Sequence, residues 1–320
     1  MAATIEEVAQ RAGVNKSTVS RALNGSLAIS QKRRLQIQEI AQELGYVGNA
    51  AARNLASNRV HTLAVVFPPV SDKQNQPFFM QILTAINAEA EKYQLTVAIV
   101  TGHTTEELKR QVKLMHLAQR ADGFIILYTK KDDLVQQYLA RHKVPFVLLG
   151  KPEENSDAVS WVNNDNLALG RAAVEVLQAA GHEKIAFVTN TTDGTVFQER
   201  YRGFSELAGK SGRLLSADSL LSQLTNETAL VVLDDVLALS VMQELTDNGR
   251  KLADDLSLVS YNNSFLGSLV RPQLTTFDIH VVVLGETVVK VLQQEIETGK
   301  HQQIQVDFTL VERDSIRRLI

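Results

Sequence analysis

Residues 15–24, Asn-Lys-Ser-Thr-Val-Ser-Arg-Ala-Leu-Asn, predict a short helix with two different sides. The apolar side consists of Val19, Ala22 and Leu23. The polar residues of the other side are Lys16, Ser17, Ser20 and Arg21. A helix that buries one side and presents cations and hydroxyls on the other has the layout of a helix that lies in a DNA groove.

The residues before this helix predict another helix and a tight turn. Thr4 and Glu7 stand three positions apart, so they can form a capping box that starts a helix at about Ile5. Gly13 is expected to end that helix, and Asn15 is a favourable N-cap for the next one. Two helices joined by so short a turn match the spacing of a helix-turn-helix.

A third helix is predicted between Ser30 and Gly45. Its expected apolar side consists of Leu35, Ile40, Ala41 and Leu44. Any three short helices with glycine turns would give the same spacing, so spacing alone leaves DNA binding open. Charge favours it, because residues 1–59 contain eight Lys and Arg against four Asp and Glu, whereas the remaining residues carry a net charge of −7.

Residues 4–25, Thr-Ile-Glu-Glu-Val-Ala-Gln-Arg-Ala-Gly-Val-Asn-Lys-Ser-Thr-Val-Ser-Arg-Ala-Leu-Asn-Gly, closely resemble the head of the LacI/GalR family of bacterial transcription regulators. The resemblance continues through Leu44-Gly45-Tyr46, Asn49, Ala52 and Leu55-Ala56. The DNA-contacting residues that it implies are Thr4, Lys16, Ser17, Thr18, Ser20, Arg21, Asn24, Tyr46, Asn49, Ala52 and Leu55.

Residues 46–60 are expected to form a linker with a hinge helix. Asn49 can cap a helix over residues 50–56, which is too short to be stable alone, because isolated helices below ~12 residues are marginal in water. The resemblance implies that this helix pairs with its mate in the minor groove, where Leu55 would wedge between base pairs. The alternative is that Leu55 anchors the linker on the core. Gly48 stands where the family usually has Pro, which loosens the start of the hinge.

Composition limits the remaining possibilities. The 320 residues contain no cysteine, no apolar run of 18 residues and no signal peptide, so we expect a cytoplasmic protein without a membrane span. No phosphate-binding glycine loop, His-Glu-x-x-His or Gly-x-Ser-x-Gly pattern is present. We therefore expect a protein that is not an enzyme, with no catalytic residue, cofactor or metal site.

Beyond His61 the sequence alternates between apolar runs and amphipathic stretches, which predicts parallel sheets covered on both faces. The predicted strands are residues 62–67, 96–100, 123–127, 146–149, 185–189, 230–233 and 256–261. Predicted helices include residues 79–93, 106–119, 167–180 and 237–248. About 260 residues are too many for one sheet, so the expected fold is α/β, with two doubly wound subdomains behind the three-helix head.

The resemblance implies a core like that of periplasmic sugar-binding proteins, in which the chain crosses between subdomains three times. The crossings are expected near residues 162–163, 276–277 and 303–305. The resulting domains are residues 1–45 (helix-turn-helix), 46–60 (hinge) and 61–320 (core). Within the core, the N-subdomain is expected at about 61–161 and 278–303, and the C-subdomain at about 162–276 and 304–320.

Three polar residues that follow predicted strands or match the family are the main candidates for an effector site: Arg200, Asp234 and Asn262. In open α/β sheets ligands bind beyond the carboxyl ends of the strands, and Arg, Asp and Asn suit the hydroxyl groups of sugars. Asp235 is expected to be the N-cap of the following helix, and Asn262 can instead be a turn residue. Further candidates, each of which can also be structural, are Phe79, Lys151 and Trp161.

Several stretches, including Gly150-Lys151-Pro152 and Ser260-Tyr261-Asn262-Asn263, resemble the maltose-operon regulators (MalR type) of Gram-positive bacteria. The resemblance implies a homodimeric repressor of a palindromic double-stranded DNA operator, controlled by a sugar effector such as maltose or a maltodextrin. Alternatives are control by a partner protein or a sugar phosphate, or a sugar-acting enzyme with a DNA-binding head. Residues 209–228 are fewer than the family usually carries there, so one wall of the pocket is open to question.

Overall fold

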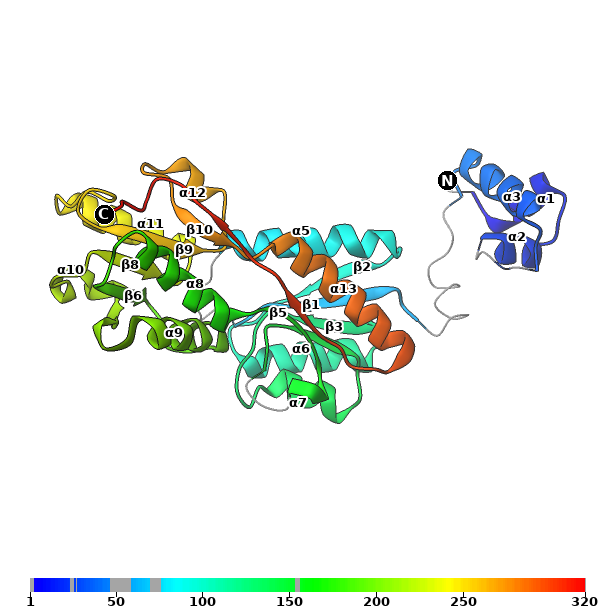
Figure 1. Ribbon diagram of the computed structural model, residues 1–320. Helices are drawn as coiled ribbons and strands as arrows, with labels where there is room; N and C mark the ends of the chain where they lie inside the picture. Colours follow the sequence, from blue (N-terminus) through cyan, green and yellow to red (C-terminus); the bar gives the residue numbers. More distant parts are fainter. Residues whose placement is uncertain are drawn as a thin grey trace. The chain divides into compact units, whose positions relative to one another are not determined.

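A computed structural model of the chain describes residues 3–23, 26, 28–46, 59–69, 76–152 and 156–319. The chain divides into two compact units, Met1–Val60 and His61–Ile320 (Figure 1). The hinge helix predicted for residues 50–56 lies outside the described residues. The same holds for the candidate DNA contacts Asn24, Asn49, Ala52 and Leu55.

The first unit is a three-helix head consisting of α1 (Ile5–Ala12), α2 (Lys16–Leu23) and α3 (Gln31–Glu43). The predicted capping box is confirmed: the Thr4 amide donates to Glu7 Oε2 at 2.7 Å, and the Glu7 amide donates to Thr4 Oγ1 at 3.3 Å. Gly13 ends α1 with φ +65°, and the Asn15 side chain caps α2 by accepting from the Thr18 amide at 2.8 Å. The predicted helix-turn-helix is therefore present.

The core of the head corrects one prediction about α3. Val8, Val19, Ala22 and Ile37 are fully buried, whereas Leu35, which was expected in the core, is 52% exposed. Two positions along a helix correspond to a turn of ~200°, so once Ile37 faces inward Leu35 faces solvent. The other residues predicted for this side, Ile40, Ala41 and Leu44, pack against the core as expected.

The second unit contains two six-stranded sheets. The first has the order β11-β5-β4-β3-β1-β2 and consists of β1 (Thr62–Val66), β2 (Thr96–Val100), β3 (Gly123–Ile126), β4 (Phe146–Leu149), β5 (Ser160–Asn164) and β11 (Gln303–Val306). The second has the order β12-β10-β9-β8-β6-β7 and consists of β6 (Ile185–Thr189), β7 (Arg213–Ser216), β8 (Ala229–Val232), β9 (Ser257–Tyr261), β10 (Thr275–Asp278) and β12 (Thr309–Val311). All neighbours are parallel except β10 and β12.

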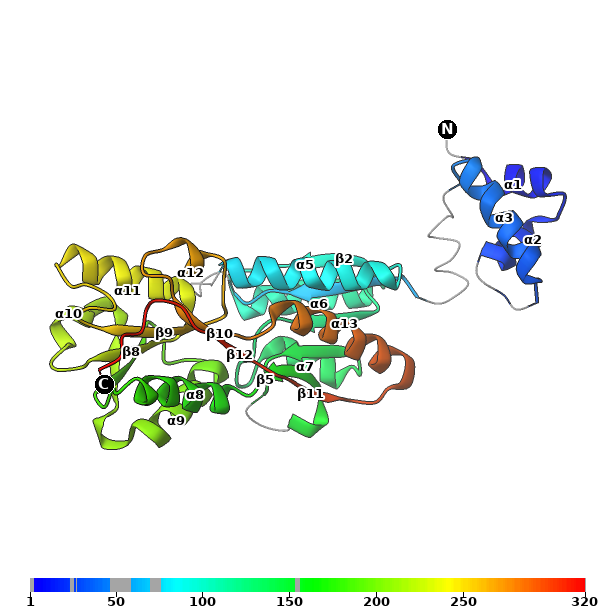
Figure 2. The same cartoon turned by 45° about the horizontal axis from the view of Figure 1, so that its top comes forward.

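Helices cover both faces of each sheet, as expected for buried parallel strands (Figures 1 and 2). Around the first sheet, which defines the N-subdomain, α5 (Gln76–Lys92) and α13 (Val281–Thr298) pack together on one face, and α6 (Thr105–Leu117) and α7 (Leu134–Arg141) cover the other. Around the second sheet, which defines the C-subdomain, α8 (Asn166–Ala179) and α9 (Thr195–Ala208) lie opposite α11 (Asp235–Asp247) and α12 (Leu266–Leu269). The short α10 (Leu220–Gln223) follows β7.

The chain crosses between the two sheets three times, after Asn164, after Asp278 and after Val306. Each crossing predicted from the sequence falls inside a strand instead, in β5, β10 or β11, so residues 162–164 belong to the first sheet and 277–278 to the second. Residues 304–306 likewise continue the first sheet, where Ile304 pairs with Val162 and Val306 with Asn164. These strands run on because their last residues still have pairing partners.

In the described parts of the chain, no helix combines the length and the apolar character needed to cross a membrane.

Candidate functional site

A cavity of about 250 Å³ lies where the carboxyl ends of the strands of both sheets meet. The N-subdomain supplies Phe78, Phe79, Leu127, Tyr128, Thr129, Leu149, Gly150, Asn163, Asn164 and Leu284. The C-subdomain and the second crossing supply Asn166, Val196, Arg200, Leu233, Asp234, Asn262 and Ile279. Ligands of doubly wound folds bind at this edge of the sheet, so the cavity is the candidate effector site.

The structure brings four of the six predicted effector residues together in this cavity: Phe79, Arg200, Asp234 and Asn262. The other two lie next to it but do not line it. Trp161 is 9% exposed and packs within the first sheet, and the Lys151 ammonium lies 5.8 Å from the centre of its ring. This cation–π contact uses the side chain of Lys151 at the surface of the N-subdomain.

Arg200 is a buried polar residue of the cavity that is held from several sides. It is 4% exposed, and its Nε donates to Asn166 Oδ1 and its Nη1 to the Leu233 carbonyl, both at 2.9 Å. The guanidinium lies 4.2 Å from the ring centre of Tyr261. Burial lowers the pKa of Arg200, and Tyr261 and Asp234 oppose that shift. The side chain is thus fixed in one orientation before any ligand contact is made.

Two glycines place Arg200 in this position by letting α8 and α9 pack backbone against backbone. A Cβ atom on Gly170 would lie 2.1 Å from the Arg200 carbonyl oxygen, and one on Gly203 would lie 2.1 Å from the Leu167 carbonyl oxygen. No side chain fits at such distances. The glycine three residues after Arg200 is therefore needed for helix packing.

The roles expected for Asp234 and Asp235 require a correction. Asp234 is the N-cap of α11, because its Oδ1 accepts from the Leu237 amide at 2.9 Å, and it also lines the cavity. Asp235 is fully buried and accepts from Ser260 Oγ, from the Ser264 amide at 2.5 Å and from Thr276 Oγ1 at 2.9 Å. Burial raises the pKa of Asp235, and these three donors oppose the shift.

Asn262 lies in a turn and lines the cavity at the same time, so its two expected roles coexist. Its φ is +94° and that of Asn263 is +48°, a region that asparagine tolerates better than most residues. The backbone N–H of Asn262 donates to the Phe277 carbonyl at 2.9 Å. Asn263 is held by Asp278 and Arg313, with Arg313 Nη2 at 2.7 Å from its Oδ1. The turn that presents Asn262 is therefore well supported.

The asparagines around the first crossing are cavity residues that the sequence did not single out. Asn166 orients Arg200 as described above. Asn164 Nδ2 donates to the carbonyls of Ile279, Val306 and Asp307 at 3.1, 3.0 and 3.2 Å. One side chain thus ties the first crossing to the other two. A cluster of polar residues directly after a buried strand was the available signal.

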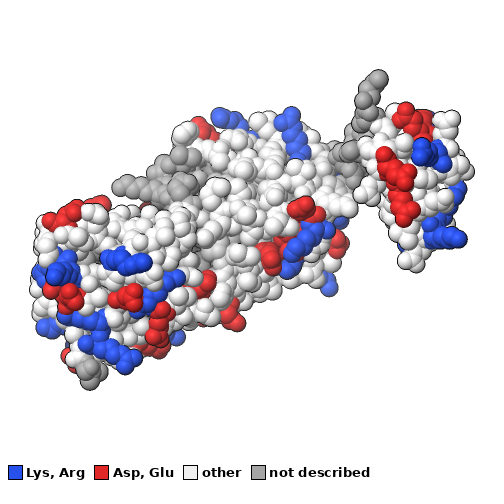
Figure 3. Space-filling view, turned by 90° about the horizontal axis from the view of Figure 1, so that it is seen from above, with Lys and Arg blue, Asp and Glu red and all other residues white. Residues whose placement is uncertain are grey.

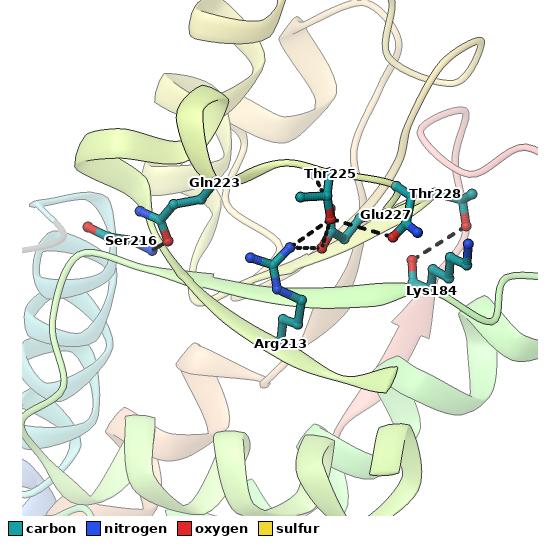
Figure 4. A network of polar contacts seen from close by, with 8 residues as sticks. Lys184, Arg213, Ser216, Gln223, Thr225, Glu227 and Thr228 are labelled. Carbon is teal, nitrogen blue, oxygen red and sulfur yellow. Dashed lines mark hydrogen bonds and ion pairs between the residues drawn. The ribbon is translucent and has the colours of Figure 1, made fainter. Parts of the chain in front are cut away.

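Residues 209–228, whose shortness had put one wall of the pocket in question, do not contribute to the lining of the cavity. They are closed by their own polar network (Figure 4). Arg213 pairs with Glu227 and donates to Thr225 Oγ1 at 3.0 Å, and the Ser216 amide donates to the Gln223 side chain at 3.2 Å. The lining residues of this cavity therefore all come from outside the short segment.

The DNA-contact candidates that the structure describes lie on α2, directly before α1 (Thr4) and after α3 (Tyr46). Lys16, Ser17 and Arg21 are exposed, although Lys16 forms an ion pair with Glu6. The Ser17 and Thr18 hydroxyls donate to Asn15 Oδ1, and Ser20 is half-buried. Thr4 is occupied by its capping box, and Tyr46 packs against the core of the head.

Two family models match the chain. Residues 4–49 match the model described as bacterial regulatory proteins of the lacI family, and residues 174–316 match the periplasmic-binding-protein-like domain. The chain belongs to the LacI family. This LacI-family regulator is 27% identical to the transcriptional regulator MalR of Staphylococcus xylosus, over 88% of each chain, and 28% identical to CelR of Thermobifida fusca, over 98% of each.

Solved structures agree over the full length of this LacI-family chain. The lac repressor dimer bound to operator and an anti-inducer matches with a TM-score of 0.79 and 25% identity, covering 99% of this chain and 100% of that one. A complex of CelR with cellobiose matches with a TM-score of 0.73 and 27% identity, covering 98% and 99%. The predicted family and fold class are therefore confirmed.

Proposed function

We propose that this LacI-family regulator represses transcription by binding a near-palindromic operator as a homodimer, and that a sugar, maltose or a maltodextrin, controls its affinity for DNA. The observation that carries the proposal is the cavity between the subdomains, lined by Arg200, Asp234 and Asn262 in a chain with a helix-turn-helix head. A ligand that prefers one arrangement of the subdomains changes DNA affinity by that preference, typically ~1–3 kcal/mol.

The chemistry of the cavity supports a sugar. Arg200, Asp234 and Asn262 offer charged and amide groups that can bond to hydroxyls in pairs, and Phe78 and Phe79 offer aromatic surface, with ring centres 5.3 Å apart. The cellobiose complex of the related CelR supports the same ligand class. Maltose is favoured within that class by the stretches that resemble MalR-type regulators.

The sugar proposal is tested by a thermal-shift screen of maltose, maltodextrins, other sugars and sugar phosphates. A ligand at 100 times its dissociation constant should add ~2.7 kcal/mol to the free energy of unfolding. The matched variant is Asp234→Ser, because serine is a good N-cap and keeps α11 intact while it removes the carboxylate. We expect that variant to bind operator normally and to lose about 10- to 100-fold in sugar affinity. If only sugar phosphates stabilise the protein, a sugar phosphate and not maltose is the effector.

Sequence preference for DNA should come from Lys16, Ser17 and Arg21, which are exposed on α2. Arg21→Ala should cost ~1–3 kcal/mol on the operator and much less on random DNA, because arginine can donate two bonds to guanine. The operator is first selected from random DNA, and binding is then measured at one salt concentration. Arg110→Ala, an exposed charge removed from α6, is the control. Equal losses on both DNAs would assign Arg21 to the phosphate backbone.

Exposed apolar side chains on the core support a homodimer. Met80, Val282 and Val283 are 59%, 58% and 46% exposed and line a groove of about 590 Å³ along α5 and the start of α13. On the face shown in Figure 3, charged side chains gather over the C-subdomain, and the middle of the N-subdomain carries few. Apolar surface of this kind marks interaction sites. Sedimentation of a dimer on the operator is expected, and a monomer on one half-site would contradict it.

A further inference from the structure

Two threonines join the subdomains across the wall of the cavity. Thr129 follows β3 of the N-subdomain, and Thr195 is the first residue of α9 in the C-subdomain. Their hydroxyl oxygens lie 2.6 Å apart, within hydrogen-bond distance, and either can be the donor. Thr195 is 6% exposed, so water competes little for this bond. The contact is separate from the three covalent crossings, which leave β5, β10 and β11.

Gly150 holds Thr129 in the orientation that makes this bond. Both residues line the cavity, and a Cβ atom on Gly150 would lie 2.9 Å from Thr129 Cγ2. Gly150 also has φ +123°, which other residues rarely adopt. A side chain at position 150 would therefore strain the backbone and push the Thr129 methyl group away, which would turn its hydroxyl from Thr195.

Opposite charges flank the threonine pair. Lys151 directly follows Gly150, and Glu199 lies one helical turn after Thr195 on α9. Burial raises the pKa of Glu199, and Lys151 opposes that shift through its positive charge. Lys151 of the N-subdomain thus attracts Glu199 of the C-subdomain beside the threonine pair. This attraction favours the arrangement in which the two threonines meet.

We propose that Thr129 and Thr195 form a latch between the subdomains, positioned by Gly150, and that opening of this latch controls access to the cavity. Asn164 bonds to both other crossings and provides the hinge about which the subdomains separate. The latch follows from the geometry of the core alone and depends neither on the identity of the effector nor on DNA binding. A net gain typical of one hydrogen bond makes opening about 2- to 10-fold rarer.

The first test uses the absence of cysteine from the chain. In the double variant Thr129→Cys with Thr195→Cys the two thiols should form a disulfide under mild oxidation of the folded protein, because the side chains already face each other. The matched control pairs Thr129→Cys with Thr192→Cys, whose second site is exposed in the loop before α9. Mass spectrometry without reductant measures the cross-link. Cross-linking of the control pair as fast as the latch pair would overturn the proposal.

The second test measures opening without any ligand or DNA. Dyes on Lys113→Cys of α6 and Gln243→Cys of α11 report the separation of the subdomains by single-molecule fluorescence transfer. Thr129→Val keeps the shape of the side chain and removes its hydroxyl, so it should raise the ratio of open to closed molecules about 2- to 10-fold. Thr192→Val removes a hydroxyl at the surface and should leave the ratio unchanged. The same ratio in the unmodified protein, Thr129→Val and Thr192→Val would show that the threonine bond does not keep the subdomains closed.

Discussion

The two walls of the cavity are held in place by different forces. The wall from the N-subdomain is the more apolar of the two, and its aromatic side chains are positioned by packing, with Phe79 against Phe67 and Phe78 at ring-centre distances of 5.6 and 5.3 Å. The wall from the C-subdomain is polar, and its residues are tied by hydrogen bonds: Arg200 to Asn166 and Leu233, and Asp234 to the start of α11. The second wall is therefore the more rigid and the less tolerant of change.

The largest effect is expected where the polar wall depends on the contact between α8 and α9. Gly203→Ala should lower the free energy of unfolding by about 3 kcal/mol, because the new methyl group would overlap the Leu167 carbonyl and the helices must separate. Urea unfolding followed by circular dichroism measures the change. Gln198→Ala, on the exposed side of the same helix, is the control. A loss no greater than that of the control would show that the helices can move apart freely.

Two buried aspartates, one in each subdomain, sharpen the comparison. Asp235→Asn should cost about 2–3 kcal/mol, because three charge-assisted bonds are lost and an amide keeps the Ser264 bond only if the Ser260 and Thr276 hydroxyls turn to accept from its NH₂ group. Asp133 accepts from the Val135 and Gln136 amides at its Oδ1, and Asn is an equally good N-cap, so Asp133→Asn should cost below about 1 kcal/mol. Equal losses in urea unfolding would remove this distinction between the two subdomains.

The same aspartates predict a pH dependence. Burial raises the pKa of both carboxyl groups in the folded protein. The protonated form is thereby favoured on folding, so the stability from each group is present below the unfolded pKa of ~3.9 and is lost as pH rises through the folded pKa. The difference in unfolding free energy between Asp133→Asn and the unmodified protein should therefore shift in favour of the variant as the pH rises from about 4 to 7. Unfolding curves across this range measure the trend, and a constant difference would contradict it.

The smallest effect is expected on the apolar wall. Phe79 is half-buried, and Phe79→Leu keeps an apolar side chain of similar length, so it should cost less than about 1.5 kcal/mol in stability. Titration with maltose should nevertheless show weaker binding, because the aromatic face is lost. A stability loss as large as that of Gly203→Ala would mean that packing makes this wall as rigid as hydrogen bonds make the other.

The sequence predicted the elements that carry strong local patterns. The long apolar runs of β1, β4 and β6 and the capping box of α1 were found because each is decided by neighbouring residues. Strands such as β5 were missed, since its polar end, Asn163 and Asn164, is buried by a partner strand about 140 residues away, in β11. Local periodicity contains no information about such a partner.

The site was predicted in part for the same reason. Arg200, Asp234 and Asn262 follow from strand ends and family motifs, and all three line the cavity. Which of Asp234 and Asp235 caps α11 was beyond local reasoning, because either carboxylate can cap a helix. The choice is made by Ser260 and Thr276, which lie 25 and 41 residues further along the chain than Asp235. The placement of Lys151 over Trp161 likewise depends on tertiary packing.

The three crossings have a consequence for the order in which the protein is synthesised. The first sheet begins at β1 but gains its edge strand, β11, only at Gln303–Val306, and the second gains β12 only at Thr309–Val311. Both sheets are thus completed within the same few residues, after nearly the whole core has been synthesised. No single cut of the chain separates two complete subdomains, and a stop codon before residue 303 would remove both β11 and β12 and turn β5 and β10 into edge strands.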